Sequence, residues 1–158
     1  MDCNEIFLNE VTHVELVAAS VCTIPVPSNA KAVTELSGCT IGTATMVIDS
    51  NDNDSYTGVL DSAPTLKSSQ KDQVGGRLRQ HDLTLTVRYN YNKVRKAVDT
   101  LQGTDFYVIL RTAGGTRYLL YSLQNTSKVT VEDQFGSAEP KQTVKASLQS
   151  LSNMIQLT

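Results

Sequence analysis

The stretch from Asp82 to Leu123 constrains the fold most, because the spacing of its apolar residues changes from that of a strand to that of a helix and back. Leucine and valine alternate with polar residues over 83–88, which predicts a strand with one buried face. Apolar residues then recur at helical spacing and predict a short amphipathic helix from Asn92 to Leu101. The apolar face of this helix consists of Val94, Ala97, Val98 and Leu101.

Two further strands are predicted after the helix, joined as a hairpin. Phe106 to Leu110 and Tyr118 to Ser122 are rich in residues that favour extended structure. The connection over Ala113 to Thr116 contains two adjacent glycines, which permit the positive φ that a tight turn requires. Gly103 can end the preceding helix in the same way.

The rest of the chain contributes more strands. His13 to Ala19 has the pattern of a strand, although its alanines and glutamate also suit a helix. Thr40 to Asp49 and Tyr56 to Asp61 flank a polar run, which predicts a hairpin. Lys128 to Glu132 and Thr143 to Leu151 alternate between apolar and polar residues. We therefore predict a mainly β fold, an antiparallel β-sandwich or barrel flanked by the one short α-helix.

The length of 158 residues suits a single domain over residues 1–158, whose core needs neither metal nor disulfide. One segment, Ala63 to Arg79, lacks apolar periodicity and contains a proline, two adjacent serines and two adjacent glycines. We interpret this segment as a long mobile loop, because structureless segments of this length usually bind a partner or become ordered on assembly.

The cellular setting is predicted from the cysteines and the N-terminus. Cys3, Cys22 and Cys39 match no zinc or redox spacing, so we expect reduced thiols. The first residues are acidic where a secretion signal would be basic, and no apolar run approaches about 18 residues. We therefore expect a soluble protein that folds in a cytoplasm and does not enter a membrane.

The charges are strongly segregated along the chain, although the net charge is only −2. Residues 1–66 carry nine acidic side chains and one basic side chain, whereas residues 67–96 carry eight basic and two acidic ones. Such segments attract each other between copies as readily as within one copy, which is compatible with head-to-tail association. Two separate solvated surfaces are the simpler interpretation of the same pattern.

Three cations, Lys93, Arg95 and Lys96, lie in the first turn of the predicted helix, where the helix dipole disfavours positive charge. This placement indicates an anionic neighbour, either an acidic side chain of another subunit or a phosphate. The predicted subunit interface comprises Lys71, Arg77, Arg79, Arg88, Lys93, Arg95, Lys96, Asp49, Asp52 and Asp54.

One polar run has part of the pattern of a calcium-binding loop. Asp49, Asn51 and Asn53 occupy alternate positions, as the oxygen ligands of such a loop do. However, Asp54 and Leu60 stand where the loop requires a glycine and a bidentate glutamate. We therefore interpret the run as a solvated loop and predict no metal site.

The chain offers few groups for catalysis. His13 and His81 are the only histidines, and neither belongs to a known catalytic pattern. Asp82 follows His81 directly, but adjacent residues of a strand point to opposite faces. We predict that the protein is not an enzyme and has no catalytic residue and no cofactor.

The basic segment over residues 67–96 also suggests a nucleic-acid-binding module as an alternative function. Its run from Arg88 to Lys96 combines cations with two tyrosines that can stack on bases. The acidic first third and a pI near 5.6 weigh against this alternative, because dedicated binders are usually basic overall.

The order of elements from Tyr89 through Leu157 resembles that of small virion proteins of tailed bacteriophages, particularly tail-tube-like proteins. The shared order is a strand, a short helix, the strand Phe106 to Leu110, a glycine turn, the strand Tyr118 to Ser122, and two late strands around Gln134 to Ser137. The resemblance implies a sandwich or barrel flanked by one helix, and self-assembly into rings or a tube.

In such an assembly a sheet lines a channel, and a long loop reaches the adjacent ring; Ala63 to Arg79 would be that loop. The resemblance also implies that the protein is made in the cytoplasm of a bacterial host and resides in the virion. Its partners would be copies of itself and other tail proteins, with DNA only as passing cargo.

Overall fold

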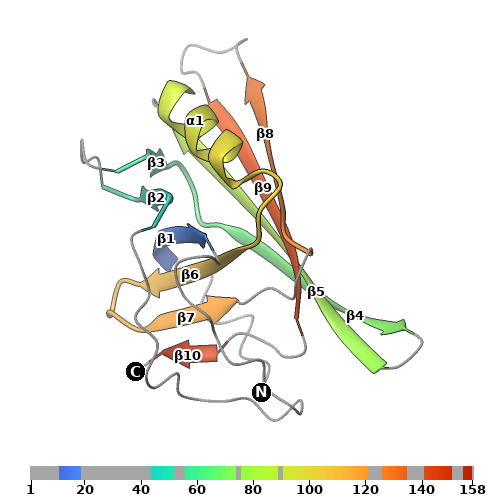
Figure 1. Ribbon diagram of the computed structural model, residues 1–158. Helices are drawn as coiled ribbons and strands as arrows, with labels where there is room; N and C mark the ends of the chain where they lie inside the picture. The colour runs from blue at the N-terminus through green and yellow to red at the C-terminus, as the bar shows by residue number, and fades with distance from the viewer. Residues whose placement is uncertain are drawn as a thin grey trace.

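The computed structural model describes residues 11–18, 44–51, 56–73, 76–88, 91–120, 126–134, 141–150 and 155–157, which form ten strands and one helix (Figure 1). The prediction of a mainly β fold with one short helix is confirmed. The elements are β1 (Val11–Ala18), β2 (Met46–Asp49), β3 (Gly58–Leu60), β4 (Thr65–Gln73), β5 (Gly76–Arg88), α1 (Tyr91–Leu101), β6 (Phe106–Thr112), β7 (Arg117–Leu120), β8 (Lys128–Gln134), β9 (Lys141–Ser150) and β10 (Ile155–Leu157).

All ten strands belong to one hydrogen-bonded sheet that is not closed. Nine of them follow the order β10-β7-β6-β1-β2-β3-β5-β9-β8, and β4 pairs with β5 outside this path. In Figure 1 the strands β6, β7 and β10 run in a clearly different direction from β5, β8 and β9. The strong right-handed twist of β-strands accounts for this change of direction across the sheet.

The pairing of β2 with β3 differs from the predicted hairpin. These strands are parallel, with Ile48 opposite Gly58 and Asp49 opposite Val59. The hairpin prediction was wrong because each strand has a stronger partner elsewhere. β2 pairs antiparallel with β1, and β3 pairs antiparallel with β5, so the chain must cross between two partners.

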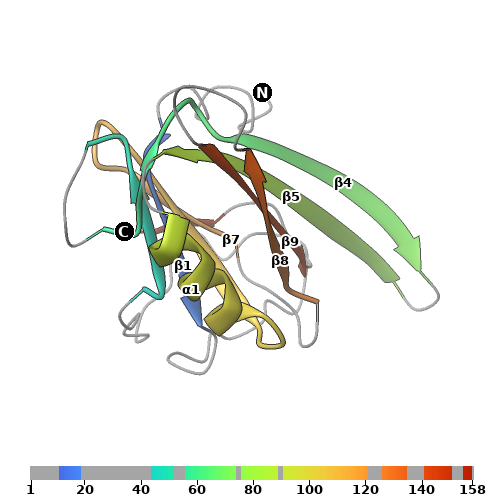
Figure 2. The same cartoon turned by 90° about the horizontal axis from the view of Figure 1, so that it is seen from above.

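The helix α1 covers the inner face of the sheet, as its apolar periodicity predicts (Figure 2). Val94, Val98 and Leu101 are almost completely buried and belong to the same core cluster as Leu85 and Val144. Burial of this apolar strip is the main source of helix stability, because a helix of eleven residues is marginal by itself. The core therefore lies between α1 and the sheet.

The predicted turns are also confirmed. Gly103 follows the helix with φ of 79°, and Gly115 has φ of 91° in the turn between β6 and β7. The Gly115 amide donates to the Thr112 carbonyl at 3.0 Å, and the Thr112 amide donates to the Thr116 carbonyl at 2.9 Å. The positive φ at Gly115 is the reason that the turn needs glycine.

The prediction of a long loop over Ala63 to Arg79 was wrong. Thr65–Gln73 is strand β4, and it pairs antiparallel with β5 over nine consecutive residues. The sequence TLKSSQKDQ conceals this strand because backbone hydrogen bonds, which any residue can make, hold it more than burial does. Leu66 of this strand packs partly against the core.

Several predictions concern residues outside the described part of the chain. The three cysteines, the aromatic Tyr89, the interface candidates Asp52 and Asp54, the loop residue Asn53 and the strand end Leu151 all lie there. The single-domain prediction stays a prediction, although every described strand belongs to one sheet.

Candidate functional site

The strands β4 and β5 form an antiparallel ribbon that projects beyond the rest of the sheet (Figures 1 and 2). Its register runs from Thr65 opposite Thr84 to Gln73 opposite Gly76. On its other side β5 pairs with β9 only from Arg79 onward. The part of the ribbon beyond Arg79 is therefore held by its own two strands alone among the described residues.

The hydrophobic core ends at the base of this ribbon. Leu66 lies opposite Leu83, and the next inward position on β5 is His81, which is only 1% exposed. The imidazole of His81 contacts the Ser68 hydroxyl at 2.8 Å and the Ser150 hydroxyl at 2.9 Å. A polar link between three strands thus replaces apolar packing where the ribbon leaves the core.

Three predicted interface residues lie on the ribbon, Lys71 and Arg77 on its projecting part and Arg79 at the point where the pairing with β9 begins. Lys71 pairs with Leu78, Arg77 pairs with Asp72, and Arg79 pairs with Gln70 in the register of the two strands. The structure thus brings Lys71, Arg77 and Arg79 together on one ribbon, where the sequence indicated only a loop.

The outer edge of β4 is the second notable feature of the ribbon. Within the part of the chain that the structure describes, β4 pairs only with β5, so its other edge carries no strand. An edge strand presents backbone N–H and C=O groups to a further strand, and a two-stranded ribbon is only marginally stable by itself in water. Both properties suit a segment that makes contact with another molecule.

The three cations of α1 do not share one environment. The Arg95 guanidinium donates to Asp133 Oδ2 at 2.6 Å, and Gln142 Nε2 donates to Asp133 Oδ1 at 2.9 Å. The hydrogen bond from Gln142, with that from Arg95, holds the pKa of Asp133 below its ordinary value. Arg95 therefore has an anionic neighbour within its own chain, which weakens its assignment to a subunit interface.

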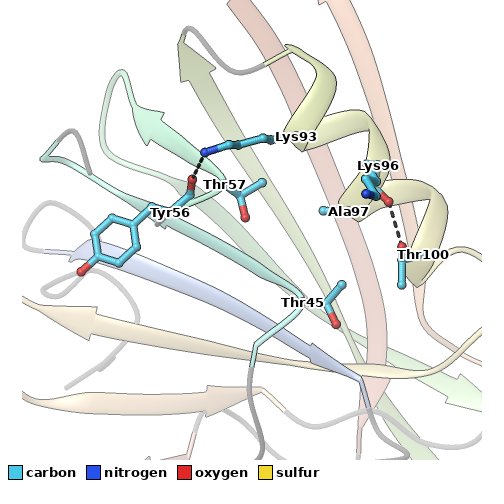
Figure 3. Close-up of a pocket in the computed structure, with 7 residues that line it drawn as sticks. All are labelled: Thr45, Tyr56, Thr57, Lys93, Lys96, Ala97 and Thr100. Carbon is cyan, nitrogen blue, oxygen red and sulfur yellow. Dashed lines mark hydrogen bonds between the residues drawn. The ribbon is translucent and has the colours of Figure 1, made fainter. Parts of the chain in front are cut away.

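Lys93 and Lys96 instead line a cavity of about 290 Å³ between α1 and the strands β2 and β3 (Figure 3). The Lys93 ammonium donates to the Tyr56 carbonyl at 3.5 Å, which places it at the cavity. The cavity is lined by Thr45, Tyr56, Thr57, Lys93, Lys96, Ala97 and Thr100.

Arg88, another predicted interface residue, takes part in an ion cluster of its own chain. Asp61 Oδ1 lies 3.3 Å from Arg88 Nε, and Asp61 Oδ2 lies 3.1 Å from Lys141 Nζ. The Asp61 amide also donates to the Thr86 carbonyl, which fixes the chain between β3 and β4. Arg88 therefore has an anionic neighbour within its own chain, at the end of β5 opposite to the projecting ribbon.

The assignment of Asp49 to an exposed interface was wrong, because this side chain is only 6% exposed. Asp49 Oδ2 lies 2.7 Å from His13 Nδ1, and Asp49 Oδ1 accepts from the Asn51 amide at 2.8 Å. Glu15 Oε1 lies 3.0 Å from the other imidazole nitrogen of His13. Since both ring nitrogens face carboxylate oxygens, this arrangement favours the doubly protonated imidazolium.

The charge of this cluster follows from its hydrogen bonds. The bond to Glu15 raises the pKa of His13, burial opposes the rise, and the bond to Asp49 adds to it. The same bond to His13 lowers the pKa of Glu15. The edge of the Tyr56 ring packs on the imidazole, with 5.6 Å between ring centroids. The cluster thus joins β1 to β2 next to the cavity.

Comparisons with protein-family models, with curated proteins and with solved structures find no match. The geometry of the described residues therefore carries the functional proposal. No helix among these residues is long and apolar enough to cross a membrane. No group of three or more His, Cys, Asp and Glu side chains in the same residues could hold a metal ion.

Sequence reasoning missed two features of the site. The cavity joins residues of α1 to Thr45 and Thr57, which lie some forty residues earlier in the chain and carry no pattern that marks them. The pairing of His13 with Asp49 spans 36 residues. A buried strand position occupied by histidine was the one available signal for the second feature, because a buried imidazole requires partners.

Proposed function

We propose that this protein is a structural virion protein that assembles with copies of itself into rings or a tube in the tail of a tailed bacteriophage. The observation that carries the proposal is the projecting ribbon of β4 and β5, which extends beyond the core and presents an edge strand. A projecting, polar, two-stranded element gains stability by contact with a neighbouring copy. Tail proteins in the same virion are the other expected partners, and DNA is only passing cargo.

The charge pattern supports contact between copies. The ribbon and the strand β5 carry most of the basic segment, whereas the first 66 residues are strongly acidic. Electrostatic attraction between such surfaces speeds association and fixes the orientation of the partners. It is screened over roughly 8 Å at physiological ionic strength, so higher salt weakens the contact.

Analytical ultracentrifugation of charge-reversal variants tests the proposal. Lys71→Glu combined with Arg79→Glu should reduce the assembled mass to that of the 17.2 kDa chain. The matched control is Lys128→Glu combined with Lys145→Glu, which reverses two charges on β8 and β9, outside the projecting part of the ribbon. The control should assemble normally, and circular dichroism should show both variants folded. Assembly of the ribbon variant, or equal loss in the control, would contradict the role of the ribbon.

The second candidate function is a nucleic-acid-binding module. One observation favours it: the residues that line a hollow of about 290 Å³ on β5, β8 and β9 include Lys128, Lys145, Thr84 and Thr130, together with the acidic Asp82. However, Glu132 lies 3.6 Å from Lys145, which reduces the attraction for phosphate. A DNA affinity that falls steeply with salt, in a protein that stays monomeric, would favour this candidate over assembly.

A further inference from the structure

A row of charged side chains crosses the strands β2, β1, β6 and β7, which are neighbours in the sheet (Figure 1). In the register of the strands, Asp49 of β2 lies opposite His13 of β1, and His13 lies opposite Arg111 of β6. Arg111 in turn lies opposite Arg117 of β7. Glu15 follows His13 by two positions on β1, so both side chains point to the same face of the sheet.

The two ends of this row differ in exposure. Asp49 and His13 are buried, whereas Arg111 and Arg117 are exposed and place two like charges directly opposite each other, an arrangement that is unfavourable by itself. Glu15 interacts with both ends. The hydrogen bond from His13 lowers the pKa of Glu15, burial opposes this effect, and the charges of Arg111 and Arg117 lower the pKa further.

The hydrogen bonds of His13 depend on the number of protons that it carries. His13 Nδ1 lies 2.7 Å from Asp49 Oδ2, and His13 Nε2 lies 3.0 Å from Glu15 Oε1. The doubly protonated ring can donate to both carboxylates, whereas the neutral ring has a single N–H. Deprotonation of His13 therefore breaks one of the two hydrogen bonds.

The bond that is lost is the one to Glu15. The side chain of Asp49 is only 8% exposed, whereas that of Glu15 is 32% exposed. A buried carboxylate that loses its donor costs more free energy than one that can turn to water or to another cation. The remaining proton of His13 therefore stays on Nδ1, where it bonds Asp49, and Glu15 is released.

The released carboxylate has a second cationic partner on the same face. Glu15 lies opposite Ile109 on β6, and Arg111 is two positions from Ile109, so Glu15 and Arg111 are diagonal neighbours within reach of long side chains. The remaining group against the imidazole is Tyr56, which contributes the edge of its ring. The pKa of His13 is raised first by its bond to Glu15, and the charge of Arg111 opposes this rise.

We propose that the row is a pH-operated switch in which Glu15 changes partner, from His13 when the imidazole is doubly protonated to Arg111 and Arg117 when the imidazole is neutral. In the first state the exposed arginine pair keeps its positive charge. In the second state Glu15 neutralises part of that charge. Loss of one buried proton thus changes the charge pattern at the exposed end of β6 and β7. The switch operates within one chain and does not depend on ring formation.

Nitrogen-15 NMR of the arginine side chains tests the proposal on the full chain, from about pH 5.5 to about pH 9, across the ordinary range of histidine. The Lys71→Glu and Arg79→Glu double variant is the background, so that assembly does not broaden the signals. As pH rises, hindered rotation of the Arg111 or Arg117 guanidinium should appear, because an ion pair restricts it. Its midpoint should coincide with the titration of the His13 ring, and the neutral ring should carry its proton on Nδ1.

Two further variants identify the groups that switch. Glu15→Gln should abolish the change at the arginines and lower the pKa of His13, whose strongest stabilising bond is weakened. The matched control is Glu132→Gln, which makes the same change at an exposed carboxylate beside Lys145 and should alter neither signal. His13→Leu combined with Asp49→Leu should leave Glu15 with the arginines throughout this pH range, so the signal of hindered rotation should be present at every pH.

The proposal is overturned if the arginine signals do not change with pH, or if their midpoint differs from that of His13. It is equally overturned if the change persists in Glu15→Gln, if Glu132→Gln abolishes it, or if neutral His13 carries its proton on Nε2.

Discussion

The strand β5 passes through two regions of opposite character, the body of the sheet under α1 and the projecting ribbon. In the body, Leu83, Leu85 and Val87 are at most 2% exposed and pack in the core. Beyond Arg79 the same strand continues past its pairing with β9 and is paired with β4. One strand thus combines a part stabilised by hydrophobic burial with a part that depends on its neighbours.

Because the two regions are held in different ways, we expect substitutions in them to affect different properties. Substitutions in the body should change the free energy of unfolding of the single chain, whereas substitutions in the ribbon should change contacts between chains. Five predictions test this division, in order from the largest expected effect to the smallest.

The largest effect is expected from Val94→Asp, at a fully buried position of α1. An unpaired carboxylate in this apolar contact should lower the free energy of unfolding by about 4 kcal/mol or more. Chemical denaturation followed by circular dichroism measures the loss. Asn92→Asp introduces the same carboxylate at an exposed position of the same helix and should change stability by less than about 0.5 kcal/mol. Equal stability of both variants would contradict the assigned helix face.

The next effect concerns His13 between its two carboxylates. His13→Leu leaves Asp49 buried without its cation and should cost about 2 to 3 kcal/mol of unfolding free energy. Double-mutant combination with Asp49→Leu should recover part of this loss, because the uncompensated charge is then removed. Purely additive losses in the double variant would contradict the ion pair.

The same cluster predicts a pH dependence. The pKa of His13 is raised above 6.5, so its contribution to stability is complete below pH 6.5 and is lost as pH rises through the raised pKa. The pKa of Glu15 is lowered below 4.5, so its contribution is complete above pH 4.5 and is lost as pH falls through the lowered pKa. Stability of the wild type should fall on both sides of this window, and His13→Leu should flatten the alkaline side.

The ribbon should be cut before the body in limited digestion by trypsin. Lys71 and Arg77 lie on its projecting part, whereas Lys96 lies on a helix that is packed on the core. Local opening of a segment with few buried contacts costs little free energy, so cleavage in the ribbon should be about ten times faster or more. Mass spectrometry of early fragments measures the order. If trypsin cleaved α1 before the ribbon, the ribbon would not be the region that opens more easily.

The smallest effect is expected from Arg95→Gln on the exposed side of α1. The pKa of Asp133 should rise toward its ordinary value but remain below it, because the hydrogen bond from Gln142 is retained. NMR titration of the carboxylate measures this change, and the melting temperature should barely move. A full return of the pKa of Asp133 to its ordinary value would show that Gln142 contributes nothing.

The parts of the fold that were predictable are those that bury a periodic face. The buried residues of α1 have helical spacing, and those of β5 alternate with polar residues. A buried face therefore appears in the sequence as a periodic pattern of apolar residues. The strand β4 has no such periodic pattern, because most of its side chains are polar and it is held to β5 by nine consecutive residue pairs rather than by a buried apolar face. The polar composition was therefore attributed to a loop.

Pairing between distant segments was the second limit of prediction. The parallel contact of β2 with β3 depends on β1 and β5, and the burial of Asp49 depends on His13. No pattern in the sequence around Asp49 indicates that β2 pairs with β3 or that Asp49 pairs with His13. The candidate site shows the same limit. The three cations of α1 were predicted to have anionic neighbours, but only the folded chain shows that Arg95 pairs with Asp133 while Lys93 and Lys96 line a cavity.

Negative-stain electron microscopy of the purified full-length protein tests the central claim most directly. The claim is that copies of this chain assemble through the ribbon of β4 and β5. Images at low salt and micromolar concentration should show rings or tubes, and images of the Lys71→Glu and Arg79→Glu double variant should show only small separate particles. Separate particles in the wild type over the whole range of concentration and salt would contradict the claim.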